Sequence, residues 1–221
     1  MSKRVMLVHA FLPSMPPIVA AFERDWPEAE VRNILDEALY ADVSPEGVMK
    51  PSVPARVASI LQHCVVSGAQ GIVFTGSTFG PAVEAARRSI SVPVLKADEA
   101  MAARAVALGR RILIVCTAMR AIPIIRANIE AAAATADVQL AIGELCVPGA
   151  KDAISAGDDE LHDRLIAEWV EREQRDYDVI VFGQISMVPS STQLPPALAK
   201  KVMCSPESTV KHLKSLLEAG R

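Results

Sequence analysis

Two short segments rich in hydroxyl and amide groups are the places where this chain could do chemistry. Residues 75–81 read Thr-Gly-Ser-Thr-Phe-Gly-Pro, and residues 183–187 read Gly-Gln-Ile-Ser-Met. Each follows a short apolar run, which is typical of a turn between a buried strand and a helix. Backbone N–H groups at a helix start attract anions, and serine and threonine add directed donors. Both segments suit a carboxylate, although an ordinary capped turn explains the same pattern.

Two other reactive side chains stand at the ends of apolar runs. His9 ends the first run, and Cys116 ends a later one and is followed by Thr117. A histidine at a strand end can act as an acid, a base or a carboxylate donor, or it can be a satisfied structural residue. Cys116 can serve as a nucleophile or pack as a small buried hydrophobe. The remaining histidines fall on polar helical faces, where we expect surface residues: His63, His162 and His212.

The strands and helices of the chain must position these groups. Short β-branched runs alternate with longer amphipathic stretches, and this pattern predicts an α/β fold of parallel βαβ units. The clearest predicted strands cover residues 5–8, 71–74, 92–95, 112–115 and 179–182, with weaker ones at 138–142 and 202–204. Helical spacing of apolar residues predicts helices through residues 57–65, 82–88 and 161–170, and from Glu207 to a stop at Gly220. Proline at residue 81 fits a helix start just after Thr78.

An internal repeat divides the chain into halves. Residues 4–8 resemble residues 111–115, which lie 107 positions later, and residues 72–74 resemble residues 180–182 at an offset of 108. We therefore expect two pseudo-symmetric, Rossmann-like parallel-sheet lobes facing a shared cleft, although chance likeness between buried strands is the alternative. Lobe one would hold residues 1–98 and 203–221, and lobe two residues 99–202, with approximate boundaries. The repeat makes Gly76 and Gln184 equivalent, at strand ends where open parallel sheets bind ligands.

Composition excludes several classes of protein. The 221 residues are 51% hydrophobic and 22% charged, and 23 basic against 26 acidic side chains give a net charge of −3 without a basic stripe. We expect no nucleic-acid partner and no membrane segment. Four scattered cysteines without CxxC spacing indicate neither a zinc site nor a disulfide framework, and they fit reduced thiols in the cytoplasm. GxGxxG, Walker A and HExxH motifs are missing, so nucleotide-binding and zinc-hydrolase functions have no support, and no two of His63, His162 and His212 have metal-ligand spacing with a carboxylate nearby, so we expect no metal.

The chain resembles the aspartate/glutamate/hydantoin racemase superfamily over almost its whole length. The segments that match are residues 8–10, 73–81, 92–95, 98–101, 114–117 and 178–187. The resemblance implies two pseudo-symmetric α/β lobes and cofactor-independent chemistry. In this family one cysteine removes the proton next to a carboxylate, and a second returns a proton on the opposite face.

The resemblance places Gly76 at the first cysteine position and Gln184 at the second. Neither side chain can act as a base, so the paired-thiol mechanism does not transfer to this chain. The arylmalonate decarboxylases, which are relatives, are similar in having glycine at the first position, but they keep the second cysteine. The resemblance also implies a substrate cradle, because four residues match positions that hold a carboxylate in the family: Ser77, Thr78, Thr117 and Ser186.

These observations lead us to expect a cofactor-independent, racemase-like isomerase acting next to the carboxylate of an amino acid or related small acid. His9 and Cys116 are the candidate bases, and Ser77 and Gln184 are candidate donors to an enolate-like intermediate. The alternatives are a carboxylate-binding protein that lost the chemistry, a decarboxylase-type lyase, and a structural protein without a ligand. We also expect a homodimer, since most soluble oligomers are symmetric and the family commonly forms dimers.

Overall fold

The computed structural model describes residues 2–44 and 47–219, which form two compact α/β units. The first unit contains the chain up to Ala97 together with the segment from Pro206 onward, and the second unit is Asp98–Ser205. The sequence places the two boundaries after residues 98 and 202, whereas the structure has them after residues 97 and 205. Each unit is built on a four-stranded parallel sheet with helices on both faces, as the sequence predicts.

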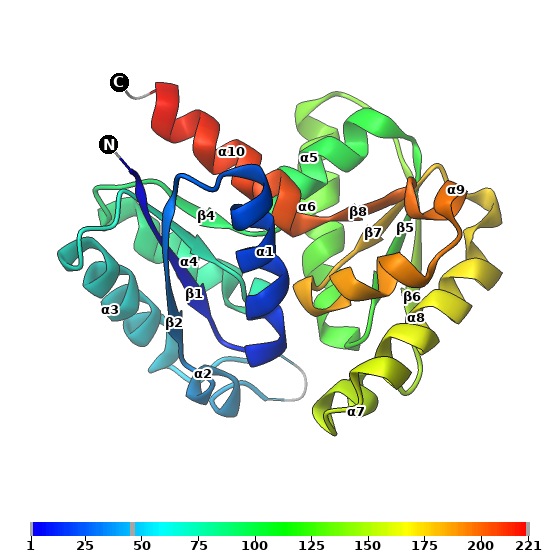
Figure 1. Ribbon diagram of the computed structural model, residues 1–221, viewed down its shortest axis with the longest axis horizontal. Coiled ribbons are helices and arrows are strands. Elements are labelled where there is room, and N and C mark those ends of the chain that lie inside the picture. The colour runs from blue at the N-terminus through cyan, green and yellow to red at the C-terminus, as the bar shows by residue number, and fades with distance from the viewer. Residues whose placement is uncertain (1, 45–46, 220–221) are drawn as a thin grey trace. The chain divides into compact units, whose positions relative to one another are not determined.

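The sheet of the first unit has the strand order β2-β1-β3-β4. Its strands are β1 (Arg4–His9), β2 (Glu30–Leu35), β3 (Gly71–Phe74) and β4 (Val94–Lys96). Its helices are α1 (Met15–Asp25), α2 (Ala38–Ala41), α3 (Val53–Val66), α4 (Gly80–Ala86) and α10 (Ser205–Ala219). In Figure 1, α1 and α10 lie on one face of this sheet and α3 and α4 on the other.

The alternation of side chains along β1 explains how both faces are covered. Met6 and Val8 belong to the apolar cluster formed with α3 and α4. Val5 points to the opposite face and is paired in register with Gly71. A Cβ atom at Gly71 would lie 3.0 Å from a methyl group of Leu213 on α10. Glycine there lets α10 pack directly on the sheet, which explains why a buried strand tolerates it.

The second unit repeats this plan with the strand order β6-β5-β7-β8. Its strands are β5 (Arg111–Cys116), β6 (Ala141–Cys146), β7 (Val179–Phe182) and β8 (Val202–Cys204). Its helices are α5 (Glu99–Leu108), α6 (Ile122–Thr135), α7 (Ala150–Ser155), α8 (Asp159–Glu173) and α9 (Pro196–Ala199), and the 3-10 segment η6 (Ile185–Gln193) follows β7. Helices α5 and α6 cover one face, and α8, α9 and η6 cover the other.

Two of the four edge strands, β2 and β6, differ most from the sequence-based prediction. The sequence does not predict β2, because its residues EVRNIL mix exposed and partly buried positions and lack the continuous apolar run of a central strand. β6 lies at Ala141–Cys146 rather than at residues 138–142, and because its residues are exposed or only partly buried, no continuous apolar run marks its bounds in the sequence. By contrast, β7 occupies the predicted residues, and all four of its residues are buried.

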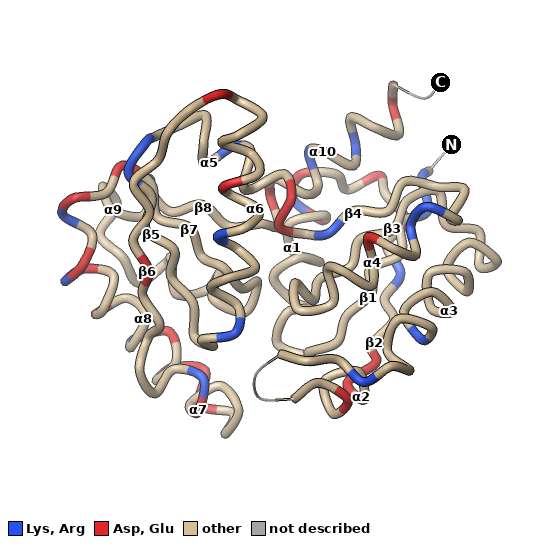
Figure 2. Tube along the Cα trace, turned by 180° about the vertical axis from the view of Figure 1, so that it is seen from behind, with Lys and Arg blue, Asp and Glu red and all other residues tan. Residues whose placement is uncertain are grey.

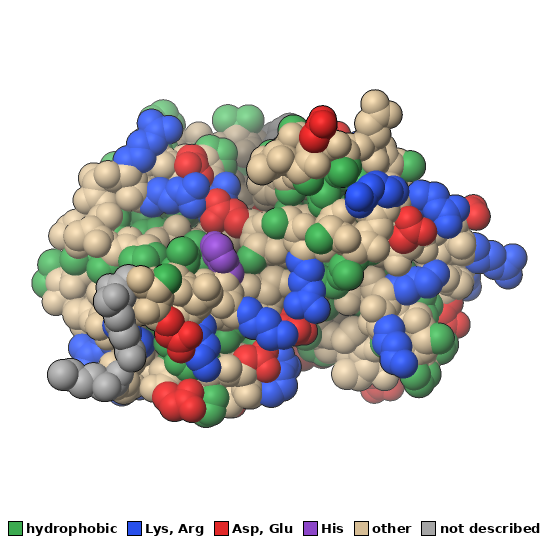
Figure 3. All heavy atoms as spheres, turned by 90° about the horizontal axis from the view of Figure 1, so that it is seen from above, with side chains coloured by type: hydrophobic (Ala, Val, Ile, Leu, Met, Phe, Trp, Pro, Cys, Tyr) green, Lys and Arg blue, Asp and Glu red, His purple; other side chains and the backbone are tan. Residues whose placement is uncertain are grey.

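Charged residues of both signs are interspersed over the helices and loops of both units and also occur in the edge strands β2 and β6 (Figure 2), whereas the central strands β3 and β7 carry none. The face shown in Figure 3 likewise mixes basic and acidic side chains with small apolar areas. Within residues 2–44 and 47–219, no helix is both long and apolar enough to cross a membrane.

Candidate functional site

At the carboxyl end of the first sheet, His9 is enclosed by hydrogen bonds. Its Nδ1 lies 3.0 Å from Thr75 Oγ1 and its Nε2 lies 3.0 Å from Asn33 Oδ1. An amide oxygen only accepts, so Nε2–H donates to Asn33, and Nδ1 of the neutral ring accepts from the Thr75 hydroxyl. The side chain is fully buried. Burial lowers the pKa of His9 below 6.5, against a smaller opposing effect of the Asn33 hydrogen bond.

Gly76 follows β3 and lies against a cluster of aromatic rings. A Cβ atom at this position would lie 2.8 Å from Phe79 Cδ2 and 3.3 Å from Phe74 Cε1. Phe79 is fully buried, and its ring centroid is 5.0 Å from that of Tyr40 and 5.8 Å from that of Phe74. The ring therefore has neighbours that restrict its movement. The space where a side chain at residue 76 would begin is occupied by Phe79.

The next two residues offer hydroxyl groups that the protein leaves available. Ser77 and Thr78 open the 3-10 turn η2 (Ser77–Phe79) that leads into α4. No described residue forms a hydrogen bond with either hydroxyl group, and neither oxygen is among the fully buried unpartnered atoms. These two groups can therefore donate to a ligand without breaking a bond inside the protein.

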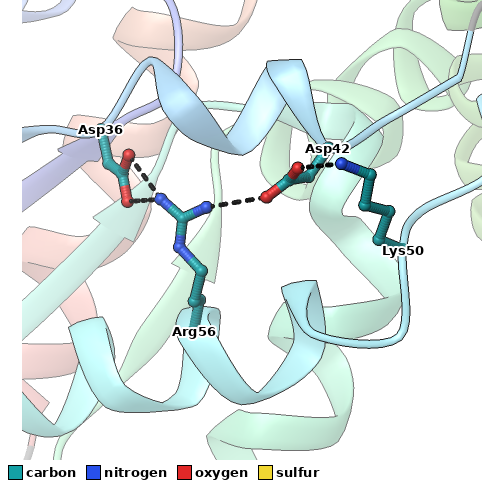
Figure 4. Close-up of polar contacts among 4 residues, drawn as sticks. All are labelled: Asp36, Asp42, Lys50 and Arg56. Carbon is teal, nitrogen blue, oxygen red and sulfur yellow. Dashed lines mark hydrogen bonds and ion pairs between the residues drawn. The ribbon is translucent and has the colours of Figure 1, made fainter.

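An ion-pair network fixes the segment that follows β2 (Figure 4). Arg56 on α3 donates to both carboxylate oxygens of Asp36, at 2.8 and 2.6 Å, and to Asp42 at 3.1 Å. Lys50 donates to the other oxygen of Asp42 at 2.6 Å, and this bond holds the pKa of Asp42 below its usual range. Asp36 precedes α2 and Asp42 follows it, so Arg56 ties both ends of this helix to α3. Helix α2 contains Tyr40, which packs on Phe79. The network thereby fixes one wall of the aromatic cluster beside residue 76.

In the second unit, the side chain of Gln184 is anchored to the end of β5. Its Oε1 accepts hydrogen bonds from the Thr117 backbone N–H at 2.6 Å, the Thr117 hydroxyl at 3.0 Å and the Ala118 backbone N–H at 3.3 Å. Gln184 stands immediately before η6, two positions after the last residue of β7. Three donors from one loop therefore converge on a single amide oxygen. Ser186 follows on η6, buried, and no described residue bonds to its hydroxyl group.

Cys116 ends β5 and is sealed into the apolar core. A Cβ atom at Gly183 would lie 2.5 Å from Cys116 Sγ and 3.0 Å from Ile125 Cγ1, so the thiol fills the space that glycine leaves. The thiol is fully buried. Burial, reinforced by Cys146 and Glu144, raises the pKa of Cys116 far above its usual range. The group is a neutral thiol at physiological pH.

His162 was expected at the surface but is buried, with 1% of its surface exposed. Its Nδ1 lies 2.8 Å from Asp163 Oδ1, and Ser190 Oγ donates to the same oxygen at 2.8 Å. The helical pattern misled the prediction because η6 packs across this face of α8. Among the described residues, no group of three His, Cys, Asp or Glu side chains could hold a metal ion, and all four cysteines are free thiols.

The family model described as Asp/Glu/Hydantoin racemase matches residues 15–213. The chain belongs to this family. Solved structures of racemases share its fold. The allantoin racemase from Klebsiella pneumoniae is 21% identical over 99% of this chain and 89% of its own, with a TM-score of 0.75. A glutamate racemase from Bacillus anthracis is 15% identical over 99% of this chain and 82% of its own, also with a TM-score of 0.75. An aspartate racemase homologue from Pyrococcus horikoshii is 17% identical over 99% of this chain and all of its own, with a TM-score of 0.68. No curated protein sequence matches.

Within this racemase-family fold, the residues singled out from the sequence form two local groups, one at each sheet. In the first unit, His9 contacts Thr75 next to Gly76, and Ser77 and Thr78 follow in the same loop. In the second unit, the predicted residues Cys116, Thr117, Gln184 and Ser186 lie at the adjoining ends of β5 and β7. The anchoring of Gln184 by Thr117 was not foreseen, because a sequence does not show which donors a glutamine meets across a sheet.

Proposed function

We propose that this protein is a cofactor-independent isomerase acting at the carbon next to the carboxylate of an amino acid or related small acid. The observation that supports it most is membership of the Asp/Glu/hydantoin racemase family along residues 15–213. An allantoin racemase, a glutamate racemase and an aspartate racemase homologue also share the fold. Removing such a proton generates an enolate-like anion, which hydrogen-bond donors stabilise.

Available hydroxyl donors support the binding of a small carboxylate. Ser77, Thr78 and Ser186 have hydroxyl groups without a partner among the described residues. Each stands in the turn after a central strand, where parallel sheets bind ligands. We propose that Ser77 and Thr78 in the first unit, and Ser186 in the second, are substrate-binding residues, because hydroxyl groups donate to carboxylates without adding charge. A homodimer, to be checked by sedimentation, belongs to the same proposal.

We propose His9 and Cys116 as the residues to test for the base. When the His9 ring takes a proton on Nδ1, its bond with Thr75 must reverse direction, so that Nδ1–H donates to Thr75 Oγ1 while the Thr75 hydroxyl donates to the Val8 carbonyl oxygen, 3.3 Å away. Cys116 must ionise in an apolar setting that raises its pKa. The variants His9→Gln and Cys116→Ser separate these two routes. Full turnover by both variants would show that the base lies elsewhere.

The experiment that tests the function is proton NMR of the protein in D2O. Aspartate, glutamate, hydantoins, hydroxy acids and substituted malonates are supplied one at a time. The proposal predicts loss of the α-proton signal from at least one of the acids or hydantoins, with inversion of the product measured by chiral chromatography. Loss of CO2 from a malonate would instead identify a decarboxylase-type lyase.

One observation favours a carboxylate-binding protein without turnover as a second candidate function. Both candidate bases are fully buried, one with each ring nitrogen bonded and one held as a neutral thiol. The same panel separates the two functions. Ligand binding raises the melting temperature by mass action whether or not turnover follows. A raised melting temperature without proton exchange across the panel would establish the binding protein and overturn the isomerase.

A further inference from the structure

The hydrogen bonds of Gln184 settle which way its amide group points. A backbone N–H can only donate, so the side-chain atom that faces the Thr117 and Ala118 backbone must be the oxygen. The NH2 group therefore points away from the β5 loop. No described residue accepts a hydrogen bond from Nε2, and this nitrogen is not among the fully buried unpartnered atoms. The protein thus holds an oriented NH2 donor that it does not use.

We propose that Gln184 is a specificity-determining donor that binds a carboxylate oxygen of the substrate through Nε2–H, and that Thr117 is the positioning residue that holds it. This inference rests on the proposed function, because it names a contact of the same substrate. It gives Thr117 a role through Gln184 in place of direct contact with the ligand. Both donor groups of Thr117 are already engaged by the glutamine oxygen.

The chemistry of the neighbouring groups favours an anionic oxygen as the partner. Gln184 Nε2 can only donate, and the available Ser186 hydroxyl lies two residues further along the same turn. A carboxylate only accepts hydrogen bonds, and a donor to a charged oxygen forms a stronger bond than a donor to a neutral one. Anchoring one end of the amide by three donors removes its rotational freedom before the ligand arrives, which lowers the entropic cost of binding.

The substitution Gln184→Glu tests the donor role without removing the anchor. One glutamate oxygen keeps the three hydrogen bonds from Thr117 and Ala118, while the other replaces the NH2 donor with a negatively charged acceptor. Malonate and L-aspartate serve as probes in isothermal titration calorimetry. We expect at least a tenfold weaker affinity than in the wild type, since a lost hydrogen bond to a charged group has about this effect. Gln193→Glu, at the exposed end of the same η6 segment, is the control and leaves the affinity unchanged.

The anchoring role has a separate test that needs no ligand. Gln184→Met leaves three donors of the loop without an acceptor and lowers the melting temperature by about 3 °C or more, whereas Gln184→Glu does not lower it. With Gln184 present, Thr117→Val weakens the binding of the probes. Thr117→Ser binds them as the wild type does, because serine keeps the hydroxyl donor. In a Gln184→Met background, Thr117→Val has no further effect on binding.

The outcomes are distinguishable. Gln184→Glu protein that is folded and binds both probes as tightly as the wild type overturns the donor role while leaving the proposed function intact. Equal melting temperatures for wild type and Gln184→Met overturn the anchoring role. A wild-type protein that binds neither probe overturns the donor role, and the proposed function stands or falls by the NMR panel.

Discussion

A methyl group added at Gly76 should destabilise the first unit through a clash with one buried ring. The new Cβ would lie 2.8 Å from Phe79 Cδ2, well inside the contact distance of about 3.5–4.0 Å between carbon atoms. The backbone is no obstacle, because φ is −94° and ψ is 97°. Overpacking of a buried group costs about 1–3 kcal/mol, and replacing glycine returns about 0.4–1 kcal/mol through the unfolded chain.

The net loss for Gly76→Ala is therefore about 1.5 kcal/mol of unfolding free energy. With a urea m-value of about 2 kcal/mol/M, the unfolding midpoint falls by about 0.7 M. Each unit contains one tryptophan, Trp26 in the first and Trp169 in the second. In a Trp169→Phe background, fluorescence of the buried Trp26 reports the first unit alone.

Two variants make the reasoning refutable. Gly80→Ala, at the first residue of α4, is the control, because its Cβ would meet only Lys96 Cδ at 3.6 Å, which is ordinary contact. Phe79→Leu removes the ring edge, so Gly76→Ala should cost at least about 1 kcal/mol less in that background. Equal unfolding free energies for Gly76→Ala and Gly80→Ala would refute the clash with Phe79. So would an equal cost of Gly76→Ala with phenylalanine and with leucine at residue 79.

Two further predictions concern the strand ends. Burial depresses the pKa of His9, so below pH 6.5 the histidine binds a proton more readily in the unfolded chain than in the folded one. The free energy of unfolding therefore falls as the pH falls below 6.5. The slope is at most about 1.4 kcal/mol per pH unit, and urea titrations from pH 7 to 5 should show it reduced in His9→Gln but retained in the exposed control His63→Gln. Gly183→Ala should lower the unfolding free energy of the second unit by about 1–3 kcal/mol, since its Cβ would lie 2.5 Å from Cys116 Sγ. Cys116→Gly in the same chain should relieve that clash, and purely additive losses in calorimetry would contradict it.

The sequence predicts elements that are buried on both sides and misses what exposure or distant contacts decide. β3 and β7 were predicted at their observed residues, because a fully buried strand is a continuous apolar run with sharp ends. β2 was missed since an edge strand needs pairing on one side only and can keep polar residues.

The candidate site shows the same division. The turn after β3 was recognised from its glycines and hydroxyl groups, which follow one another in the chain. The anchoring of Gln184 by Thr117 joins residues 67 positions apart. The closure of the space at Gly76 depends on the rotamer of Phe79 and on its packing against Tyr40. None of these contacts follows from local pattern, because each depends on how separate elements meet.

The return of α10 to the first sheet has a consequence for the order of folding during synthesis. The second unit is continuous in the chain and ends at Ser205, where α10 begins, so the ribosome synthesises the whole unit before the rest of α10. Leu213 and Leu217 of α10 pack against Gly71, on one face of the first sheet. Domains usually fold during translation from the N-terminus onward, yet here the unit that starts first is completed last. Until α10 is synthesised, the face of the first sheet at Gly71 lacks the leucine side chains that cover it, and transiently exposed apolar surface of this kind is what chaperones protect from aggregation.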